Sequence, residues 1–323
     1  MKCLVLAEST QGAPTALACE LLGLGRSLVD EAGGTVEAVL LGGGSAAQAL
    51  IAHGAERVRV AEHELLGEYH AEAWTAALAA ICREITCDLI LIGHHAIGAE
   101  LAPRLAFRLG TTAATGCVAV TCDAGKFSFT RPCYGGNARE VVTFKTRPAV
   151  VTIRRGSHPS LAADASRSGV VERVTVHLDA AALRTKVIAR TRDAVDSTRL
   201  EDANAIVAGG RGINGAAGFR VLAELAHALG GAVGASRVPC DLGWCPRSWQ
   251  IGLTGRTVTP ELYIAVGISG AGHHMAGCGG AKAIVAVNTD ANAAIFREAR
   301  YGVVGDYQQF IPAFAAEVRK LRA

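Results

Sequence analysis

Two glycine-rich segments in the second half of the sequence have residue types and spacings that suit the binding of a phosphate group. Ser269-Gly270-Ala271-Gly272 follows the apolar run 262–268 and precedes a helical stretch, so its backbone N–H groups can point at an anion. Gly210-x-Gly212-x-x-Gly215 also lies between a buried strand and a helix, and glycines at this spacing let a backbone approach a pyrophosphate. Either segment could instead be a plain tight turn. We favour a phosphate-bearing ligand at 269–272 and leave both interpretations of 210–215 open.

Basic side chains stand close to these segments. Arg237 follows the run 231–236, at the carboxyl end of a predicted strand, where doubly wound sheets bind their ligands. It has no acidic residue within three positions and could also be merely solvated. His273 and His274 follow the segment 269–272, where an imidazole could donate to a ligand oxygen. The pair 94–95 follows another strand without an acidic or cysteine partner nearby, and we interpret it as surface or loop residues.

Several other chemistries do not fit the sequence. A P-loop at 250–257 would need a glycine where Gln250 stands and a lysine where Arg256 stands, and a serine-hydrolase elbow would need a glycine at Ala271. The ten cysteines include no C-x-x-C spacing, although the pairs 82/87, 117/122 and 240/245 share a C-x4-C spacing. We therefore expect no metal site and interpret the cysteines as small buried residues in a reducing cytosol.

The elements that must position these residues are typical of an α/β protein. The 323 residues are half apolar, which excludes a disordered chain and leaves room for two domains. Strands at 2–7, 35–42, 56–60 and 88–93 alternate with helices at 14–32, 46–53, 71–84 and 101–109. This alternation predicts a parallel sheet covered on both faces. Four further runs at 117–122, 126–132, 139–144 and 149–154 have no helices between them and predict an antiparallel addition at the sheet edge.

A second α/β unit follows a mixed segment, with a linker expected at 190–203. Its predicted strands are 205–208, 231–236, 262–268 and 283–288, and its predicted helices are 216–229 and 310–321. We therefore expect domains at 1–195 and 196–323, the second with a doubly wound sheet. The net charge is only +3 and its basic residues are scattered, so we expect no nucleic-acid partner. We find neither a targeting sequence nor an apolar run of membrane-spanning length, and we expect a cytoplasmic protein that is not inserted in a membrane.

The C-terminal half resembles the alpha (large) subunit of electron transfer flavoprotein. The resemblance is nearly continuous over about a hundred residues, and the first half matches more loosely. The matching segments are GGRG (209–212), VGASR (233–237), D-x-GW (241–244), TGRTVTPELYIAVGISGA (254–271), AVN (286–288), IF (295–296), YGVVGD (301–306), DLILIG (88–93), LAPRLAFRLG (101–110) and RPCYGGNA (131–138).

The resemblance implies that the C-terminal domain binds FAD, mostly at the carboxyl ends of its sheet, and that a beta subunit completes a heterodimer. Carried over position by position, the implied FAD contacts are Arg211, Ser236, Arg237, Ile251, Gly252, Leu253, Thr254, Ser269, Gly270, Ala271, Gly272, His273, His274, Asn288, Asp306 and Tyr307. No catalytic residue is implied, because the family carries electrons and has no substrate of its own.

Roles for these residues follow from the same resemblance. Arg237 would lie against the isoalloxazine ring and stabilise negative charge on it when it is reduced. Thr254 would hydrogen-bond the N5 edge of the ring, and His274 the N1/O2 edge. Ser269 and the amides after it would hold the pyrophosphate, while Asn288 and Asp306 would serve the adenosine end.

The sequence departs from the family pattern at four of its positions. Leu253 stands where the family usually has Gln, Gly272-His273 replaces Ile-Gln, and Thr289 replaces a Lys. These departures bear on the redox potential and the details of flavin contact.

The resemblance implies a carrier that takes electrons from flavin dehydrogenases, of the acyl-CoA or N-methyl amino-acid type, and passes them to a membrane quinone reductase. One alternative is an electron-bifurcating complex with a second FAD in the beta subunit. A second, of another class, is an NAD-dependent enzyme that uses the glycines at 210–215. A third is an interaction protein that has lost its flavin, which the presence of Arg237, Ser269, His274 and Asn288 disfavours.

Overall fold

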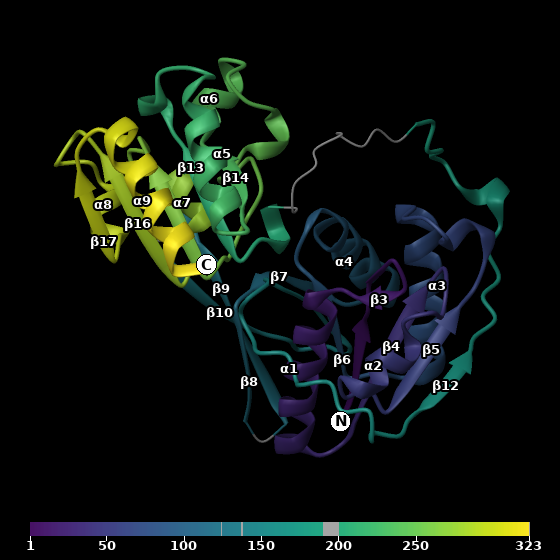
Figure 1. Cartoon of the computed structure of the whole chain (residues 1–323). Helices are drawn as coiled ribbons and strands as arrows, with labels where there is room; N and C mark the ends of the chain where they lie inside the picture. The colour runs from purple at the N-terminus through teal and green to yellow at the C-terminus, as the bar shows by residue number, and fades with distance from the viewer. Residues whose placement is uncertain (124, 137, 190–199, 323) are drawn as a thin grey trace. The chain divides into compact units, whose positions relative to one another are not determined.

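The computed structural model describes residues 1–123, 125–136, 138–189 and 200–322 (Figure 1). The chain forms two compact units, one of Met1–Cys133 and Arg139–Arg190 and the other of Tyr134–Ala138 and Thr191–Ala323. The expected domain boundary between residues 195 and 196, and most of the expected linker at 190–203, lie outside the described residues.

The first unit contains a seven-stranded parallel sheet in the order β12-β5-β4-β1-β6-β11-β7. Its strands are β1 (Lys2–Leu6), β4 (Thr35–Leu41), β5 (Arg57–Ala61), β6 (Leu89–Gly93), β7 (Ala113–Cys117), β11 (Ala149–Ile153) and β12 (Val170–Arg173). The central strands are apolar along nearly their whole length because both faces of the sheet are covered. The predicted parallel sheet is confirmed.

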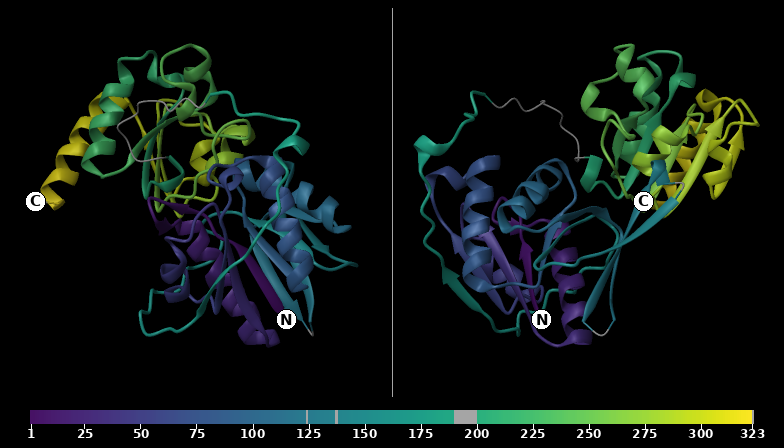
Figure 2. Two further views of the ribbon diagram at one scale, coloured as in Figure 1. Left: turned by 90° about the vertical axis from the view of Figure 1, so that its right-hand side faces the viewer. Right: turned by 180° about the vertical axis from the view of Figure 1, so that it is seen from behind.

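Helices cover both faces of this sheet, as Figure 2 shows around β1. Helices α1 (Ala16–Ala32) and α2 (Ala47–Ala52) pack on one face, and α3 (Ala71–Ile85) and α4 (Ala96–Leu109) on the other. Helix α4 begins five residues before the predicted start because the His95 side chain caps it, with Nδ1 accepting from the Ile97 N–H at 3.3 Å. Shorter elements of this unit are β2 (Ser9–Thr10), β3 (Ala13–Pro14) and the 3₁₀ turns η1 (Glu64–Leu66) and η3 (Ala180–Ala182).

The four runs of the predicted antiparallel addition divide between two sheets. Strands β8 (Ala119–Asp123), β9 (Lys126–Cys133) and β10 (Ala138–Thr143) form a separate sheet in the order β10-β9-β8, with β8 and β9 antiparallel. The fourth run is β11, which pairs in parallel with β6 and β7 inside the main sheet. All five residues of β11 are buried, whereas exposed and buried residues alternate along β8. Complete burial was the feature that set the fourth run apart. The sequence also gave no indication of β12.

The second unit contains a five-stranded parallel sheet in the order β14-β13-β15-β16-β17. Its strands are β13 (Ala205–Gly209), β14 (Ala232–Ala235), β15 (Leu262–Val266), β16 (Ala283–Asn288) and β17 (Tyr301–Val304). Helices α5 (Gly218–Ala228) and α9 (Tyr307–Arg322) pack on one face, and α7 (Gly272–Cys278) packs on the other. The remaining helical elements are α6 (Arg237–Asp241), α8 (Ile295–Glu298), η4 (Leu200–Asp202), η5 (Arg211–Ile213) and η6 (Arg247–Trp249), and η2 (Tyr134–Gly136) is grouped with this unit.

The order of these strands creates a point at which ligands commonly bind. From β13 the chain first adds β14 on one side and then crosses to add β15 on the other side of β13. A crevice opens at the carboxyl ends of the strands where such a change of direction occurs. The ends of β13 and β15 are therefore the place in this sheet to look for a site.

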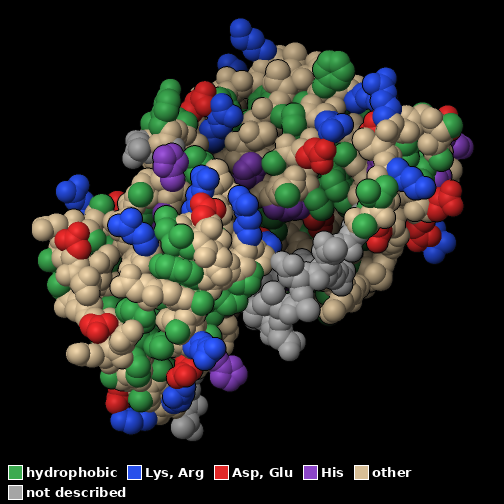
Figure 3. Space-filling model, turned by 90° about the horizontal axis from the view of Figure 1, so that it is seen from above, with side chains coloured by type: hydrophobic (Ala, Val, Ile, Leu, Met, Phe, Trp, Pro, Cys, Tyr) green, Lys and Arg blue, Asp and Glu red, His purple; other side chains and the backbone are tan. Residues whose placement is uncertain are grey.

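The described residues carry few features of membrane or nucleic-acid binding. None of their helices combines the length with the apolar composition that crossing a bilayer requires. On the face drawn in Figure 3, Lys and Arg side chains are interspersed with Asp and Glu and form no continuous basic surface. This distribution agrees with the small net charge of the sequence.

Candidate functional site

The candidate site lies at the carboxyl ends of the strands of the second sheet, because parallel strands all end at the same edge. Arg211 follows β13, Ser236 follows β14 and Ser269 follows β15, while Asn288 is the last residue of β16 and Asp306 comes shortly after β17. The structure therefore brings segments that are almost a hundred residues apart in the sequence to one edge of one sheet.

The loops after β13 and β15 are held in direct backbone contact. Gly210 N–H donates to the Val266 carbonyl at 2.8 Å, and Gly212 N–H donates to the Gly267 carbonyl at 3.1 Å. A Cβ atom on Gly210 would lie only 2.1 Å from the Gly267 oxygen. Close packing between two loops thus explains the first two glycines of the 210–215 motif without any nucleotide.

The loop after β15 presents backbone donors. Among the described residues, the N–H groups of Ser269, Gly270 and Ala271 donate to no other protein group. Gly270 has φ +84°, and a Cβ there would lie 2.3 Å from the Ile295 nitrogen, so only glycine suits the turn. The turn is fixed by the Ile295 N–H, which donates to the Ser269 carbonyl at 3.0 Å. Successive unpaired amides in a fixed turn form a concavity that suits an anion.

Two exposed arginines stand near this edge. Arg211 lies in the turn η5 and is exposed to solvent. The Arg237 side chain is 64% exposed, and its Nε lies 3.0 Å from Asp241 Oδ2. Ser236 precedes it and fixes the start of α6, because its N–H donates to the Gly209 carbonyl at 2.9 Å. Asp241 lies four positions after Arg237, at the i+4 spacing at which a helix brings two side chains together.

His274 is buried, and both of its ring nitrogens have partners inside the protein. Nδ1 lies 3.1 Å from the Ile251 carbonyl oxygen and must donate to it, so Nε2 accepts from the Tyr263 hydroxyl at 2.9 Å. Burial lowers the pKa of His274 to about 4. This arrangement differs from the expected contact between the His274 imidazole and the ligand. His273, by contrast, is exposed.

Residues 250–254 lie beside the end of β14 and reach the same edge of the sheet. Ile251 is buried and donates its N–H to the Ala235 carbonyl at 2.8 Å, while Leu253 N–H donates to the His273 carbonyl at 2.7 Å. The Leu253 side chain is 60% exposed. Gly252 makes the turn between them with φ +144°, and the Thr254 hydroxyl accepts from Gln250 Nε2 at 3.0 Å. Tyr263 and Gln250, neither of which the sequence identified, therefore help to position this segment.

The last three predicted residues have mainly internal partners. Asn288 Nδ2 donates to the Ile268 carbonyl at 3.0 Å, and the Tyr307 hydroxyl donates to the Ile213 carbonyl at 3.0 Å. Tyr307 is buried, so its side chain anchors the loop after β13. Asp306 is exposed, and its carboxylate accepts from the Gln308 N–H at 2.9 Å at the start of α9. Asp306 is therefore the most accessible side chain of the three.

The interpretation of His94 and His95 in the first unit needs correction. His95 Nε2 lies 2.6 Å from Glu8 Oε1, and His94 Nδ1 lies 2.8 Å from Thr152 Oγ1. Burial lowers the pKa of His94 to about 4. Both histidines are thus fixed partners of other strand-end residues. The sequence could not reveal this, since Glu8 lies 87 positions before His95.

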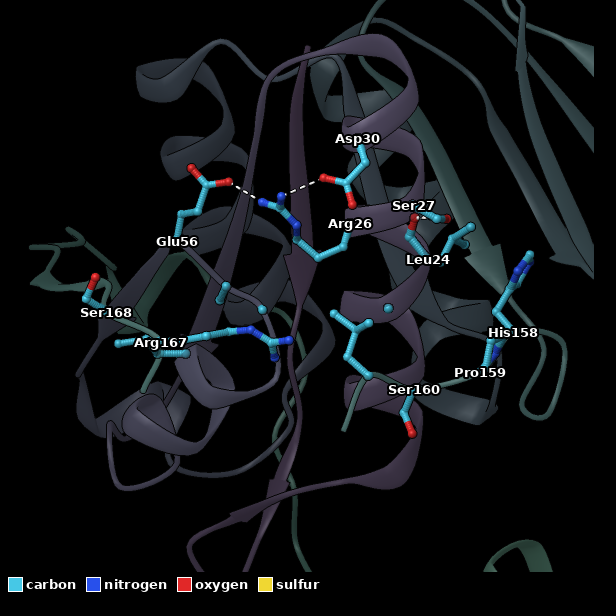
Figure 4. Close-up of a pocket in the computed structure, with 15 residues that line it drawn as sticks. Leu24, Arg26, Ser27, Asp30, Glu56, His158, Pro159, Ser160, Arg167 and Ser168 are labelled. Carbon is cyan, nitrogen blue, oxygen red and sulfur yellow. Dashed lines mark hydrogen bonds and ion pairs between the residues drawn. The ribbon is translucent and has the colours of Figure 1, made fainter. Parts of the chain in front are cut away.

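The first unit also contains a separate cavity of about 550 Å³ (Figure 4). Arg26 crosses it and pairs with Asp30, Nη2 to Oδ1 2.6 Å, and also with Glu56. His158 and Arg167 line other parts of the wall. None of the predicted ligand-binding residues lines this cavity. Within the described residues, no group of three or more His, Cys, Asp or Glu side chains is arranged to hold a metal ion.

Comparison with known proteins identifies the family. Residues 3–179 match the family model described as the electron transfer flavoprotein domain, and residues 199–279 match the electron transfer flavoprotein FAD-binding domain. The second range includes the predicted site residues up to His274 and ends before Asn288, Asp306 and Tyr307. FAD is thus the cofactor of the C-terminal domain.

Relatives match over almost the entire chain. Electron transfer flavoprotein subunit alpha of Thermoanaerobacterium thermosaccharolyticum is 39% identical over 322 residues, which cover 98% of each chain. The protein of the same name from Bacillus subtilis is 40% identical over 323 residues, covering 99% of this chain and 98% of the relative. Protein FixB of Clostridium saccharobutylicum is 36% identical, covering 98% and 96%. The chain belongs to the alpha-subunit family of electron transfer flavoproteins.

Proposed function

We propose that this chain is the FAD-carrying subunit of a heterodimeric electron carrier. It pairs with a beta subunit, accepts electrons from flavin dehydrogenases of the acyl-CoA or N-methyl amino-acid type, and delivers them to a membrane quinone reductase. The name "subunit alpha" of its relatives supports an assembly with another subunit. The carrier has no substrate of its own.

The observation that carries this proposal is the set of free amides at 269–271. A pyrophosphate has oxygens on both of its phosphorus atoms that accept hydrogen bonds, and three consecutive N–H donors at a strand end suit such a group. Gly272 follows these donors, and a Cβ atom there would meet no protein atom within 4 Å, so the space beside it is open. The residues present therefore fit the cofactor at its most highly charged part.

The other predicted residues divide between the two ends of the cofactor. Arg237, Thr254 and the backbone of 251–253 would serve the isoalloxazine end, and Asn288, Asp306 and Tyr307 the adenosine end, with Arg211 and Ser236 beside the crevice. When bound, FAD supplies a ring that accepts and releases electrons singly or in pairs. The exposed Arg237 guanidinium would provide positive charge at the isoalloxazine ring, and the Asp241 carboxylate would partly offset that charge.

His274 would act as a positioning residue in this arrangement. Its neutral imidazole holds the Ile251 carbonyl, and its backbone neighbour His273 accepts from the Leu253 N–H. These two bonds fix the turn at Gly252 and so orient Leu253 and Thr254. Leu253 would place an apolar, exposed side chain at a position where the resemblance implies a Gln.

The experiment that tests this proposal is co-expression with the beta subunit, followed by purification and an absorption spectrum. We expect a 1:1 heterodimer with flavin absorption bands and about one FAD per alpha chain, which is reduced by a flavin dehydrogenase and its substrate. A colourless protein that binds NAD would favour the nicotinamide alternative. A monodisperse alpha monomer that retains full flavin and accepts electrons would overturn the proposed requirement for the beta subunit.

A further inference from the structure

Two cysteines that the proposed function does not use lie side by side in the second unit. The sulfur atoms of Cys240 and Cys245 are 3.5 Å apart. Cys240 belongs to α6, and the chain turns back at Gly243, where φ is +71°, to bring Cys245 against it. The Trp244 N–H donates to the Pro239 carbonyl at 2.9 Å, which fixes the return of the chain. The sulfur contact is thus built into an ordered turn.

The two thiols differ in exposure and in acidity. Cys240 is half-buried, whereas Cys245 is buried, with 8% of its surface exposed. The hydrogen bond from the Cys245 thiol lowers the pKa of Cys240 and outweighs burial and the Asp241 carboxylate, which raise it, while Arg247 adds to the lowering. The same bond raises the pKa of Cys245. A thiolate is the nucleophilic form of cysteine. Cys240 therefore has the properties of an attacking thiol, and Cys245 those of a thiol that resolves the product.

The other two C-x4-C pairs provide an internal comparison. Cys82 and Cys87 also share a hydrogen bond, but they are only 4% and 5% exposed. Cys117 and Cys122 lie in β7 and β8, and both are buried. The pair 240/245 thus combines contact between the two sulfurs with access from solvent.

We propose that Cys240 and Cys245 form a redox-active dithiol that hydrogen peroxide closes to a disulfide and that small dithiols reopen. This site is independent of the proposed electron-carrier function.

The chemistry needs only the peroxide and the two side chains. The Cys240 thiolate attacks one oxygen of hydrogen peroxide and the O–O bond breaks, which leaves a sulfenic acid and a hydroxide that takes up a proton to become water. The Cys245 sulfur then attacks the Cys240 sulfur, and the S–O bond breaks. The hydroxyl group leaves with the Cys245 proton as a second water. Two thiols and one peroxide give one disulfide and two waters.

The geometry permits this closure with a small movement. The sulfurs must approach by about 1.5 Å to reach the S–S bond length. Residues 241–244 between the two cysteines are largely exposed, so the turn has room to adjust. Closure would attach the end of α6, directly beside Asp241, to the loop that follows it.

The test uses the complete flavin-loaded protein and maps thiols by mass spectrometry. Trypsin releases both cysteines on the single peptide 238–247, because Arg237 and Arg247 flank them. After treatment with hydrogen peroxide and then iodoacetamide, we expect this peptide to be unalkylated and lighter by two hydrogen atoms than the reduced peptide. Subsequent dithiothreitol, followed by fresh iodoacetamide, should give a doubly alkylated peptide. Peptides containing Cys82 and Cys87 should stay reduced.

Two variants sharpen this result. Cys245→Ser should abolish the loss of two hydrogen atoms and leave Cys240 to accumulate as sulfenic acid, detected with a dimedone reagent. Cys133→Ser removes another partly exposed thiol, which has no role in the proposal, and should leave the disulfide yield unchanged. The proposal is overturned if peptide 238–247 stays doubly alkylated while Cys133 is oxidised. It is also overturned if Cys240 proceeds to sulfinic acid with Cys245 free, or if the disulfide joins two chains.

Discussion

The Nε atom of Arg237 lies 3.0 Å from Oδ2 of Asp241, one turn further along the short helix α6. Both side chains are well exposed, at 64% and 45%, and ion pairs in such surroundings contribute about 0–1 kcal/mol to stability. The pair therefore does little to hold the fold. Its main effect is to reduce the positive charge that Arg237 presents at the strand ends.

Removing the positive or the negative charge of this pair should move the flavin midpoint potential in opposite directions. Arg237→Ala removes positive charge, disfavours the reduced ring and should lower the potential by roughly 40 mV for one electron, or about 1 kcal/mol. Asp241→Asn removes the offsetting negative charge and should raise it. Spectroelectrochemical titration of both variants measures the shifts. If neither variant moves the potential, Arg237 is not near the ring.

The amides at 269–271 depend on the glycine between them. Gly270→Ala introduces a Cβ that would lie 2.3 Å from the Ile295 nitrogen, at a backbone φ of +84°. We expect the turn to shift, the protein to lose about 1–3 kcal/mol of stability, and the purified heterodimer to retain less FAD. Gly43→Ala, in the first unit, is the control, since a Cβ there meets nothing within 4 Å. Equal flavin content in both variants would contradict the assigned pyrophosphate site.

Acid should destabilise the second unit through His274. The pKa of His274 is lowered by burial from 6.5 to about 4 in the folded protein, so between these values the unfolded chain binds more protons. The stability is complete above pH 6.5 and falls as the pH decreases towards 4, by on the order of 3 kcal/mol. Hydrogen exchange of second-unit peptides from pH 7 to 4 measures this. The decline should be clearly shallower in His274→Gln, and parallel curves would rule out His274 as its source.

Local sequence features identify the segments at this sheet edge, whereas the contacts of individual side chains depend on the assembled sheet. Strand ends and glycines are local features, so the loops at 210–215, 237 and 269–274 could be identified from residue types alone. The partners of His274 could not, because Tyr263 and Ile251 reach it only when the second sheet and its loops are assembled. Adjacent residues such as His273 and His274 can face opposite ways, and no local pattern reports which one is buried.

The fold, too, was predicted where local patterns determine it and missed where contacts between distant segments do. Alternating strands and helices predicted both parallel sheets, since burial of both faces leaves near-continuous apolar runs. The position of β11 between β6 and β7 was missed because strand order depends on contacts between distant segments. Strand β12 was missed because its residues 170–173 are mostly exposed and lack the pattern of a buried strand.

A buried ion pair in the first unit should be far more sensitive to substitution than an exposed one. Arg59 Nε donates to Glu37 Oε2 at 2.8 Å, and both side chains are at most 10% exposed. Glu37→Ala leaves the guanidinium buried without this partner and should cost about 3–5 kcal/mol. Glu140→Ala breaks the more exposed pair with Arg131 and should cost less than about 1 kcal/mol. Urea denaturation compares the two. Equal losses of stability would show that Glu172, whose Oε2 lies 3.2 Å from Arg59 Nη1, compensates for the missing Glu37 carboxylate.

The hydrogen bond from Tyr307 to Ile213 has a consequence for how the protein is made in the cell. Tyr307 begins the final helix, so the ribosome synthesises the anchor of the β13 loop about ninety residues after the loop itself. Gly305, whose N–H donates to the Asn288 carbonyl, is synthesised only shortly before Tyr307. The edge at which we propose that FAD binds is therefore completed only after residue 307 has been synthesised. We therefore expect the flavin to be loaded late in synthesis, and a chain that ends before residue 307 to lack a finished binding edge.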